Sequence, residues 1–212
     1  MIHTEIKGQA LCLETSEKLF SPTAIDKGTL AMLSVTEFLP DDKVLDLGCG
    51  CGVVGILAAK LTSGKNVTMC DISPDAVNIA RKNAVQNDVG DITVIQSDGF
   101  SNISDSGYTL ILSNPPYHTD FSVAKGFIEN GYKRLAVGGR MIMVTKRLDW
   151  YKNKLTAFFG GVRVKELDGY FVFTAEKRAD KKSKPEKAKK NTLSKKLQRK
   201  YSKSKGTANE KN

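Results

Sequence analysis

The tetrapeptide Asn114-Pro115-Pro116-Tyr117 offers the clearest chemistry in this sequence. It directly follows residues 108–113 (YTLILS), an apolar run that predicts a buried strand. Because prolines have no N–H group for the ladder, the chain must leave the sheet there as a rigid loop. Asn114 offers a hydrogen-bond acceptor on this loop, and Tyr117 offers a flat stacking surface. Together they suit a planar substrate that carries an NH2 group.

A glycine-rich segment, residues 46–52 (DLGCGCG), closes a second apolar stretch at 43–47. Its glycines permit positive φ angles and the close approach of a ligand to the backbone. The dinucleotide-binding fingerprint needs a further glycine where this chain has Val53. Asp46 stands two residues before the first glycine. An acid at that position suits a cationic or amino-bearing ligand better than a phosphate.

Two further carboxylates follow the next predicted strands. Asp71 ends the run 66–71, where an acid can accept hydrogen bonds from both ribose hydroxyls of a nucleoside. Asp98 comes just after the run 91–95 and could accept from an adenine amino group, with Phe100 beside the ring. Taken alone, each acid could equally be a helix cap or a turn residue. Three acids at the ends of three successive strands, beside a glycine-rich turn, favour a nucleoside site.

Strands and helices alternate along the body of the chain. Strands are predicted at 43–47, 66–71, 91–95, 108–113 and 140–145, helices up to about residue 61 after the glycine turn and at 74–87, 121–136 and 149–159, and a closing strand pair at 162–166 and 170–175. This alternation predicts an α/β fold in which helices cover both faces of a parallel sheet. Ligands of such sheets bind beyond the carboxyl ends of the strands, where the glycine turn and the tetrapeptide both fall.

Capping signals set several element ends. Ser73 predicts the N-cap of the helix after the second strand, and Gly138-Gly139 predicts the C-cap of the helix before the fifth strand. Near the amino end, Gly8 predicts a hairpin within residues 1–20. A helix over 24–39 is then expected to precede the first strand.

The net charge of +10 is unevenly distributed. Residues 177–212 hold 15 Lys/Arg and 3 Asp/Glu, whereas residues 1–176 are nearly neutral. We therefore predict a domain over 1–176 and a Lys-rich tail over 177–212 that has too few apolar residues to fold alone. The tail could bind RNA phosphates in a salt-dependent manner, or be a solvated segment without a specific partner.

Several function classes are disfavoured by composition. The N-terminal residues 1–10 lack the apolar segment of a secretory signal. The longest uncharged stretches, 47–59 and 106–119, are shorter and more polar than the roughly 18 apolar residues of a membrane span. The four cysteines have no zinc-binding spacing, so we expect reduced thiols and no metal. A cytoplasmic protein without membrane contact is expected.

In combination, these segments resemble the class I S-adenosylmethionine-dependent methyltransferases. Residues 46–52 are similar to the first motif of those enzymes, and residues 114–117 to the fourth motif of their amino-methylating branch. Asp71 matches their ribose-binding acid and Asp98 their adenine-binding acid. The resemblance covers about residues 20–175. It implies a doubly wound, Rossmann-like sheet of seven mostly parallel strands with an antiparallel last strand.

A finer resemblance points to the methyltransferase small domain family, which includes bacterial small-subunit rRNA guanine-N2 methyltransferases. Leu19-Phe20-Ser21, Asp26-Lys27-Gly28-Thr29 and Gly169-Tyr170-Phe171-Val172 are similar to segments of that family. The two-domain bacterial enzymes carry a second, degenerate copy of the domain that this chain lacks, so the chain resembles a single-domain form. The resemblance implies S-adenosyl-L-methionine as cofactor, bound by Phe20, Gly28, Thr29, Asp46, Gly48, Cys49, Gly50, Asp71, Ile72, Asp98, Gly99, Phe100 and Asn114.

By the same resemblance, the tetrapeptide holds the amine that receives the methyl group. The side-chain oxygen of Asn114 and the backbone carbonyl of Pro115 would accept its N–H bonds, and Tyr117 would stack on the base. The first hypothesis is methylation of an exocyclic amine of RNA, guanine N2 in ribosomal RNA above all, with RNA bound by the active-site edge and the tail. The alternatives are adenine in RNA or DNA, a glutamine amide in protein, and an RNA-binding assembly factor without catalysis.

Overall fold

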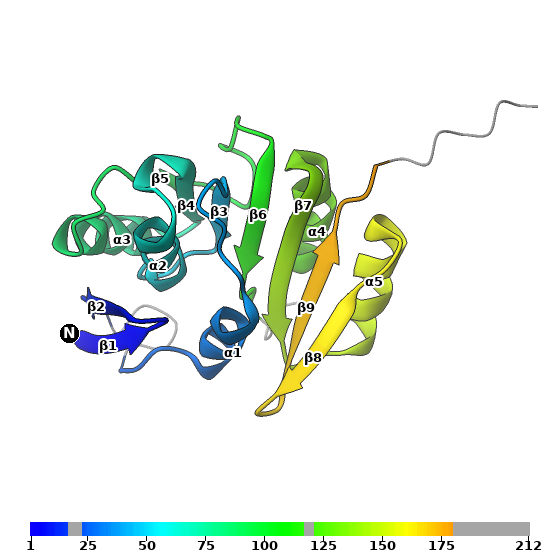
Figure 1. Ribbon diagram of the computed structural model, residues 1–212, viewed down its shortest axis with the longest axis horizontal. Coiled ribbons are helices and arrows are strands. Elements are labelled where there is room, and N and C mark those ends of the chain that lie inside the picture. The colour runs from blue at the N-terminus through cyan, green and yellow to red at the C-terminus, as the bar shows by residue number, and fades with distance from the viewer. Residues whose placement is uncertain (17–22, 117–120, 180–212) are drawn as a thin grey trace, which may run out of the picture. The chain divides into compact units, whose positions relative to one another are not determined.

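The computed structural model describes residues 1–16, 23–116 and 121–179 and contains the predicted seven-stranded sheet (Figure 1). Its spatial order is β5 (Thr93–Gln96), β4 (Val67–Asp71), β3 (Val44–Leu47), β6 (Tyr108–Ser113), β7 (Leu135–Thr145), β9 (Tyr170–Glu176) and β8 (Arg163–Leu167). The strands from β5 to β7 are mutually parallel, and β9 is antiparallel to both of its neighbours. The predicted fold class is confirmed.

Helices cover both faces of the sheet (Figure 1). The helices α1 (Lys27–Val35), α2 (Val53–Leu61) and α3 (Pro74–Gln86) share one apolar cluster with one face of the sheet, and α4 (Ser122–Arg134) and α5 (Asp149–Phe159) share a second cluster with the other face. Successive strand residues point to opposite faces, so Leu110 and Leu112 join the first cluster and Ile111 joins the second. The buried, continuously apolar strands are those expected of a parallel sheet.

The predicted N-terminal hairpin is present as β1 (Ile2–Ile6) and β2 (Gln9–Leu13). Its turn places Lys7 and Gly8 at φ angles of 52° and 74°. Asn83 of α3 holds the end of β2 in place, because its side chain accepts from the Glu14 N–H at 2.7 Å and donates to the Glu14 carbonyl at 2.9 Å. The same amide donates to the Cys51 carbonyl at 2.9 Å, which links the hairpin to the glycine-rich turn.

Helix α1 is shorter than the predicted span of 24–39. Asp26 is its N-cap and accepts from the Thr29 N–H, and the backbone becomes extended at Thr36. The segment after Thr36 contains Pro40 and passes to β3 without helical structure, apart from turn residues. Since proline disfavours helical geometry in the residue before it, Pro40 is incompatible with the predicted helix end at residue 39.

The prediction that Gly138-Gly139 caps a helix was wrong. Helix α4 ends at Arg134, and the two glycines lie inside β7, where the pairing with β6 shifts register between Tyr108 and Leu110. Gly138 has a φ of 82°, and a Cβ on Gly139 would lie 2.8 Å from the Tyr108 carbonyl oxygen. The glycines therefore mark an irregularity inside a strand. Glycines serve this purpose as well as the ending of helices.

Residues Met1–Ala179 form one unit. The tail beyond Ala179 lies outside the described residues, so its separation from the domain stays a prediction. Within the described ranges, no helix is long and apolar enough to cross a membrane.

Candidate active site

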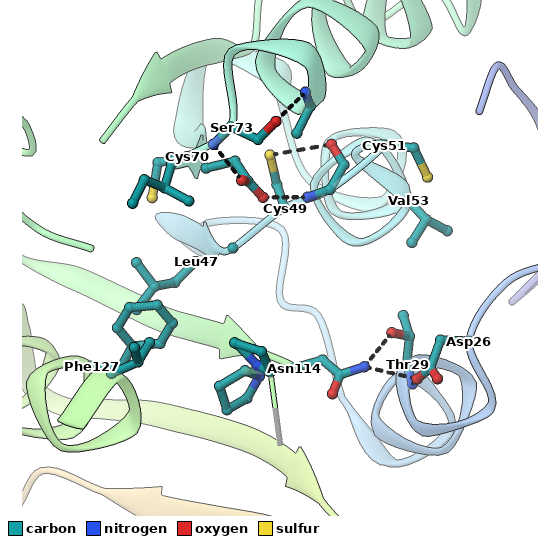
Figure 2. A pocket seen from close by; sticks show the side chains of 18 of the residues that line it. Asp26, Thr29, Leu47, Cys49, Cys51, Val53, Cys70, Ser73, Asn114 and Phe127 are labelled. Atoms are coloured by element: carbon teal, nitrogen blue, oxygen red, sulfur yellow. Dashed lines mark hydrogen bonds between the residues drawn. The ribbon is translucent and has the colours of Figure 1, made fainter. Parts of the chain in front are cut away.

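A cavity of about 360 Å³ opens at the carboxyl ends of β3, β4 and β6. The glycine-rich turn and the start of α3 line one side, and the loop after β6 and the start of α1 line the other. Figure 2 shows Cys49 and Asn114 on opposite sides of this space. The volume lies within the usual range of small-molecule sites. The strand-end geometry expected from the sequence therefore produces a cavity of ligand size.

The glycine-rich turn is a tight loop that only glycines can form at low cost. Gly48, Gly50 and Gly52 have φ angles of 80°, 54° and 89°. The N–H groups of Gly48 and Cys49 both donate to the Cys70 carbonyl at 2.9 Å. Gly48, Cys49 and Gly50 all line the cavity, as predicted.

Asp71 connects this turn to α3. One carboxylate oxygen accepts from the Gly50 N–H at 2.9 Å, and the other accepts from the Ser73 N–H at 2.9 Å. Each carboxylate oxygen has a second lone pair, so both can still accept a hydroxyl. Asp71 and the neighbouring Ile72, which is 63% exposed, line the cavity. The position is compatible with the predicted contact to a ribose.

Asp46 differs from its predicted role. It is buried and accepts from the Gly55 N–H in α2 at 2.9 Å, and the cavity lining does not include it. Burial, with a smaller contribution from the charge of Asp71, raises the pKa of Asp46 to about 7. Its carboxyl group holds the start of α2, directly after the turn, so any effect on a ligand would be transmitted through the backbone.

The adenine side of the predicted site contains a different aromatic residue. Asp98 and Gly99 line the cavity, but Phe100 is buried in the second apolar cluster. Phe127 of α4 lines the cavity instead, and its ring would lie 3.3 Å from a Cβ on Gly99 (Figure 2). The sequence prediction missed Phe127 because it is distant in sequence and reaches the site only through the packing of α4.

Asn114 has an amide with a defined orientation. Its Nδ2 donates to Asp26 Oδ2 at 2.8 Å and to Thr29 Oγ1 at 3.0 Å (Figure 2). Its Oδ1 is buried and has no hydrogen-bond partner among the described residues. Pro115 lies beside it and also lines the cavity. A buried acceptor without a partner is costly, so this oxygen is an anchoring point for a ligand that donates an N–H.

The remaining predicted site residues differ in whether they line the cavity. Thr29 lines the cavity. Gly28 does not, and a Cβ there would lie 2.8 Å from the Tyr170 ring, so it permits the close approach of α1 to β9. Phe20 and Tyr117 lie outside the described residues, and their roles stay predictions.

Asp26 was not among the predicted site residues, although it lines the cavity and binds Asn114. Its helix-capping position was visible in the sequence as an acid three residues before Thr29. The contact with Asn114 had no local sequence signal.

The cysteines at this edge are neutral groups. Burial raises the pKa of Cys70 to about 12 and the pKa of Cys49 well above its usual value. The two thiols therefore contribute small, uncharged surface to the cavity. No cluster of three or more potential metal ligands occurs in the part of the chain that the structure describes.

The sequence profile of the methyltransferase small domain matches residues 10–174. The chain belongs to this family. The profile begins within the N-terminal hairpin and ends in β9, so it covers every strand of the sheet. The resemblance drawn from the sequence motifs is thereby confirmed.

Sequence similarity to curated methyltransferases agrees with this family assignment. The chain is 32% identical over 163 residues to the ribosomal RNA small subunit methyltransferase C of Serratia proteamaculans, covering 75% of this chain and 46% of the relative. It is 34% identical to the protein of that name from Pseudomonas putida, covering 74% of this chain and 48% of the relative. The chain thus spans about half the length of these relatives.

Solved structures show the same fold. A 16S rRNA N2 methyltransferase of T. thermophilus, solved in complex with AdoMet and guanosine, has a TM-score of 0.76 and 24% identity, covering 84% of this chain and 50% of that one. TrmN of Thermus thermophilus has a TM-score of 0.60 and 25% identity, and the match covers 69% of this chain and 47% of TrmN.

Proposed function

We propose that this protein transfers the methyl group of S-adenosyl-L-methionine to an exocyclic amine of a nucleobase in RNA, with guanine N2 of ribosomal RNA as the favoured target. The observation that carries the proposal is the buried Oδ1 of Asn114, which has no hydrogen-bond partner among the described residues and belongs to a residue that lines a cavity of about 360 Å³. The names of the relatives support this choice of substrate: the sequence relatives are named for ribosomal RNA, and the structural one was solved with guanosine.

The described residues fit the cofactor. The glycine turn leaves open backbone next to Asp71, whose carboxylate suits ribose hydroxyls, while Asp98 and Phe127 suit an adenine ring. The bound cofactor would supply a methyl group on a sulfonium cation. The glycine turn, Asp71 and Asp98 follow the neighbouring strands β3, β4 and β5, so this part of the site is assembled as the sheet forms.

The acceptor residues suit an aromatic amine. The lone pair of such an amine is delocalised into the ring and becomes nucleophilic as the nitrogen turns pyramidal. Acceptors that hold both N–H bonds favour that geometry, and they act more strongly as the nitrogen becomes positive during transfer. Asn114 Oδ1 and the Pro115 carbonyl would hold them, and Tyr117 would stack on the base.

The RNA must present an unpaired or flipped base, because a base inside a duplex cannot enter such a cavity. The Lys-rich residues 177–212 would bind the phosphates of the same RNA. We propose that this reaction takes place in the cytoplasm.

The decisive experiment is incubation of the full chain with cofactor labelled in its methyl group and with RNA, protein or DNA from a strain that lacks the protein. Label in ribosomal RNA, recovered as N2-methylguanosine, is the expected result. Label in protein glutamine, or in adenine, would replace the proposed substrate. Cofactor binding without transfer to any fraction would favour an assembly role.

A further inference from the structure

The amide of Asn114 is held by two acceptors from a distant part of the chain. Asp26 is the N-cap of α1 and Thr29 lies in its first turn, 88 and 85 residues before Asn114. An amide nitrogen has two N–H groups, and these two contacts use both. Figure 2 shows the Asn114 side chain pointing toward Asp26 and Thr29, which lie at the start of α1.

The chemistry of these partners decides which way the amide faces. A carboxylate only accepts hydrogen bonds, so a flipped amide would place its oxygen 2.8 Å from Asp26 Oδ2. That oxygen–oxygen contact is repulsive, whereas the N–H contact is a charge-assisted hydrogen bond. The nitrogen of Asn114 therefore faces α1, and the oxygen is left for a ligand.

We propose that Asp26 and Thr29 are positioning residues that fix the Asn114 amide with its oxygen toward the amine to be methylated. This inference rests on the proposed function and assigns the start of α1 a part in it. Neither residue touches the reacting atoms in this role; both act through Asn114. The start of α1 thus belongs to the acceptor side of the site as well as to the fold.

Fixing the amide matters because transfer depends on the direction of approach. An amide free to rotate would present its NH2 group to the substrate amine part of the time, and donor would then meet donor. Misplacement of a reacting group by about 1 Å can reduce a rate about 100-fold. Asp26 is itself held by its bond from the Thr29 N–H at 2.8 Å, so the helix transmits its rigidity to the loop.

Asp26 also caps α1, so its variants must separate the two roles. Asp26→Ser retains a good capping residue, but the hydroxyl is one atom shorter than the carboxylate and does not reach Asn114. Asp26→Asn retains an oxygen that can accept from both the Thr29 N–H and the Asn114 amide nitrogen. We expect kcat to fall about 10- to 100-fold in Asp26→Ser, and Asp26→Asn to recover most of that loss.

Thr29 gives a second, independent pair. Thr29→Val keeps the shape of the side chain and removes the acceptor, whereas Thr29→Ser keeps the hydroxyl. We expect a lower kcat in Thr29→Val and recovery in Thr29→Ser. A matched control is Thr36→Val at the other end of α1, which removes the buried hydroxyl bond to the Met32 carbonyl at 2.8 Å and should lower stability while leaving kcat unchanged.

A readout independent of activity is the pair of side-chain NH2 signals of Asn114 in an NMR spectrum, assigned by their loss in Asn114→Ala. In the wild type these protons should exchange slowly with water, and in Asp26→Ser and Thr29→Val they should exchange faster. Unchanged exchange, or an unchanged kcat at saturating cofactor, would overturn the positioning role. If the wild type shows slow exchange yet transfers no methyl group to RNA, the proposed function fails and the amide contact stands.

Discussion

The two halves of the cavity are built in different ways. On the cofactor side, the contacts join residues that are close in sequence or lie on paired strands: Asp71 binds the N–H of Ser73 two residues away and that of Gly50 21 residues away. On the acceptor side, Asn114 depends on Asp26 and Thr29, more than 80 residues away. The cofactor half is mainly backbone geometry, and the acceptor half is mainly side-chain geometry.

Because the two halves are built differently, they should tolerate different substitutions. A backbone-built half loses function when a turn cannot form, so its glycines matter more than the identity of its side chains. A half built from side chains depends on each polar contact and on the helix that supplies it. Substitutions in the two halves should therefore separate cleanly into effects on cofactor affinity and effects on turnover.

The largest expected effect is on the acceptor side, in Asn114→Ala. We expect kcat to fall by about 100- to 1,000-fold, since one acceptor aimed at developing charge is removed. Cofactor affinity, measured by calorimetry with S-adenosylhomocysteine, should change little. Retained turnover would show that Asn114 does not hold the amine.

The next effect concerns RNA binding by the tail. Deletion of 180–212 leaves Lys177, whose backbone pairs with Gly138 and Gly139, in place and removes most of the basic excess. RNA affinity should fall about tenfold or more at low salt, and its dependence on salt should become shallower. Cofactor affinity serves as the internal control. An unchanged salt dependence would show that the tail does not bind the phosphates.

The contrast between the halves also explains what the sequence could predict. The glycine turn, Asp71 and Asp98 were identifiable because strand ends, turns and their acids are local patterns. The fold followed from the alternation of such patterns. Asn114 was found as part of a rigid tetrapeptide, but the direction of its amide depends on α1, and no local pattern connects the two segments.

At two other places the structure differs from the sequence prediction because of contacts between distant segments. Phe100 was expected beside the ligand because it follows Asp98 in sequence, yet Phe127 is placed there by the packing of α4. Gly138-Gly139 carries the signature of a helix end and forms a strand irregularity, since β7 begins directly after α4 and Gly139 lies against the Tyr108 carbonyl. Long-range packing decided both cases.

On the cofactor side, Asp71→Ala should weaken cofactor binding by about 10-fold or more. It removes two hydrogen bonds that hold the turn and the start of α3, and bonds to charged groups contribute about 1.5–3 kcal/mol each. With cofactor at saturation, kcat should return close to the wild-type value. A kcat that stays low under saturation would mean that the halves are coupled.

The smallest effect on cofactor affinity and turnover is expected at Asp46, which lies behind the cofactor side and whose titration acts on stability instead. Its pKa is about 7 in the folded protein and about 3.8 when unfolded. Between these values the folded state keeps a proton that the unfolded state has lost, so this group lowers the free energy of unfolding as the pH rises from about 4 to about 7.

Asp46→Asn keeps an oxygen for the Gly55 N–H and removes the charge. Its stability advantage over the wild type should be near zero at pH 4 and grow to a limit of roughly 4 kcal/mol at pH 8, measured by urea unfolding. Glu5→Gln, an exposed change on β1, controls for net charge. Because Asp46 does not line the cavity, cofactor affinity should change less than stability. If the free energy of unfolding depends on pH in the same way in wild type and variant, the pKa of Asp46 is not raised by folding. A large loss of cofactor affinity in the variant would place Asp46 among the residues that bind the cofactor.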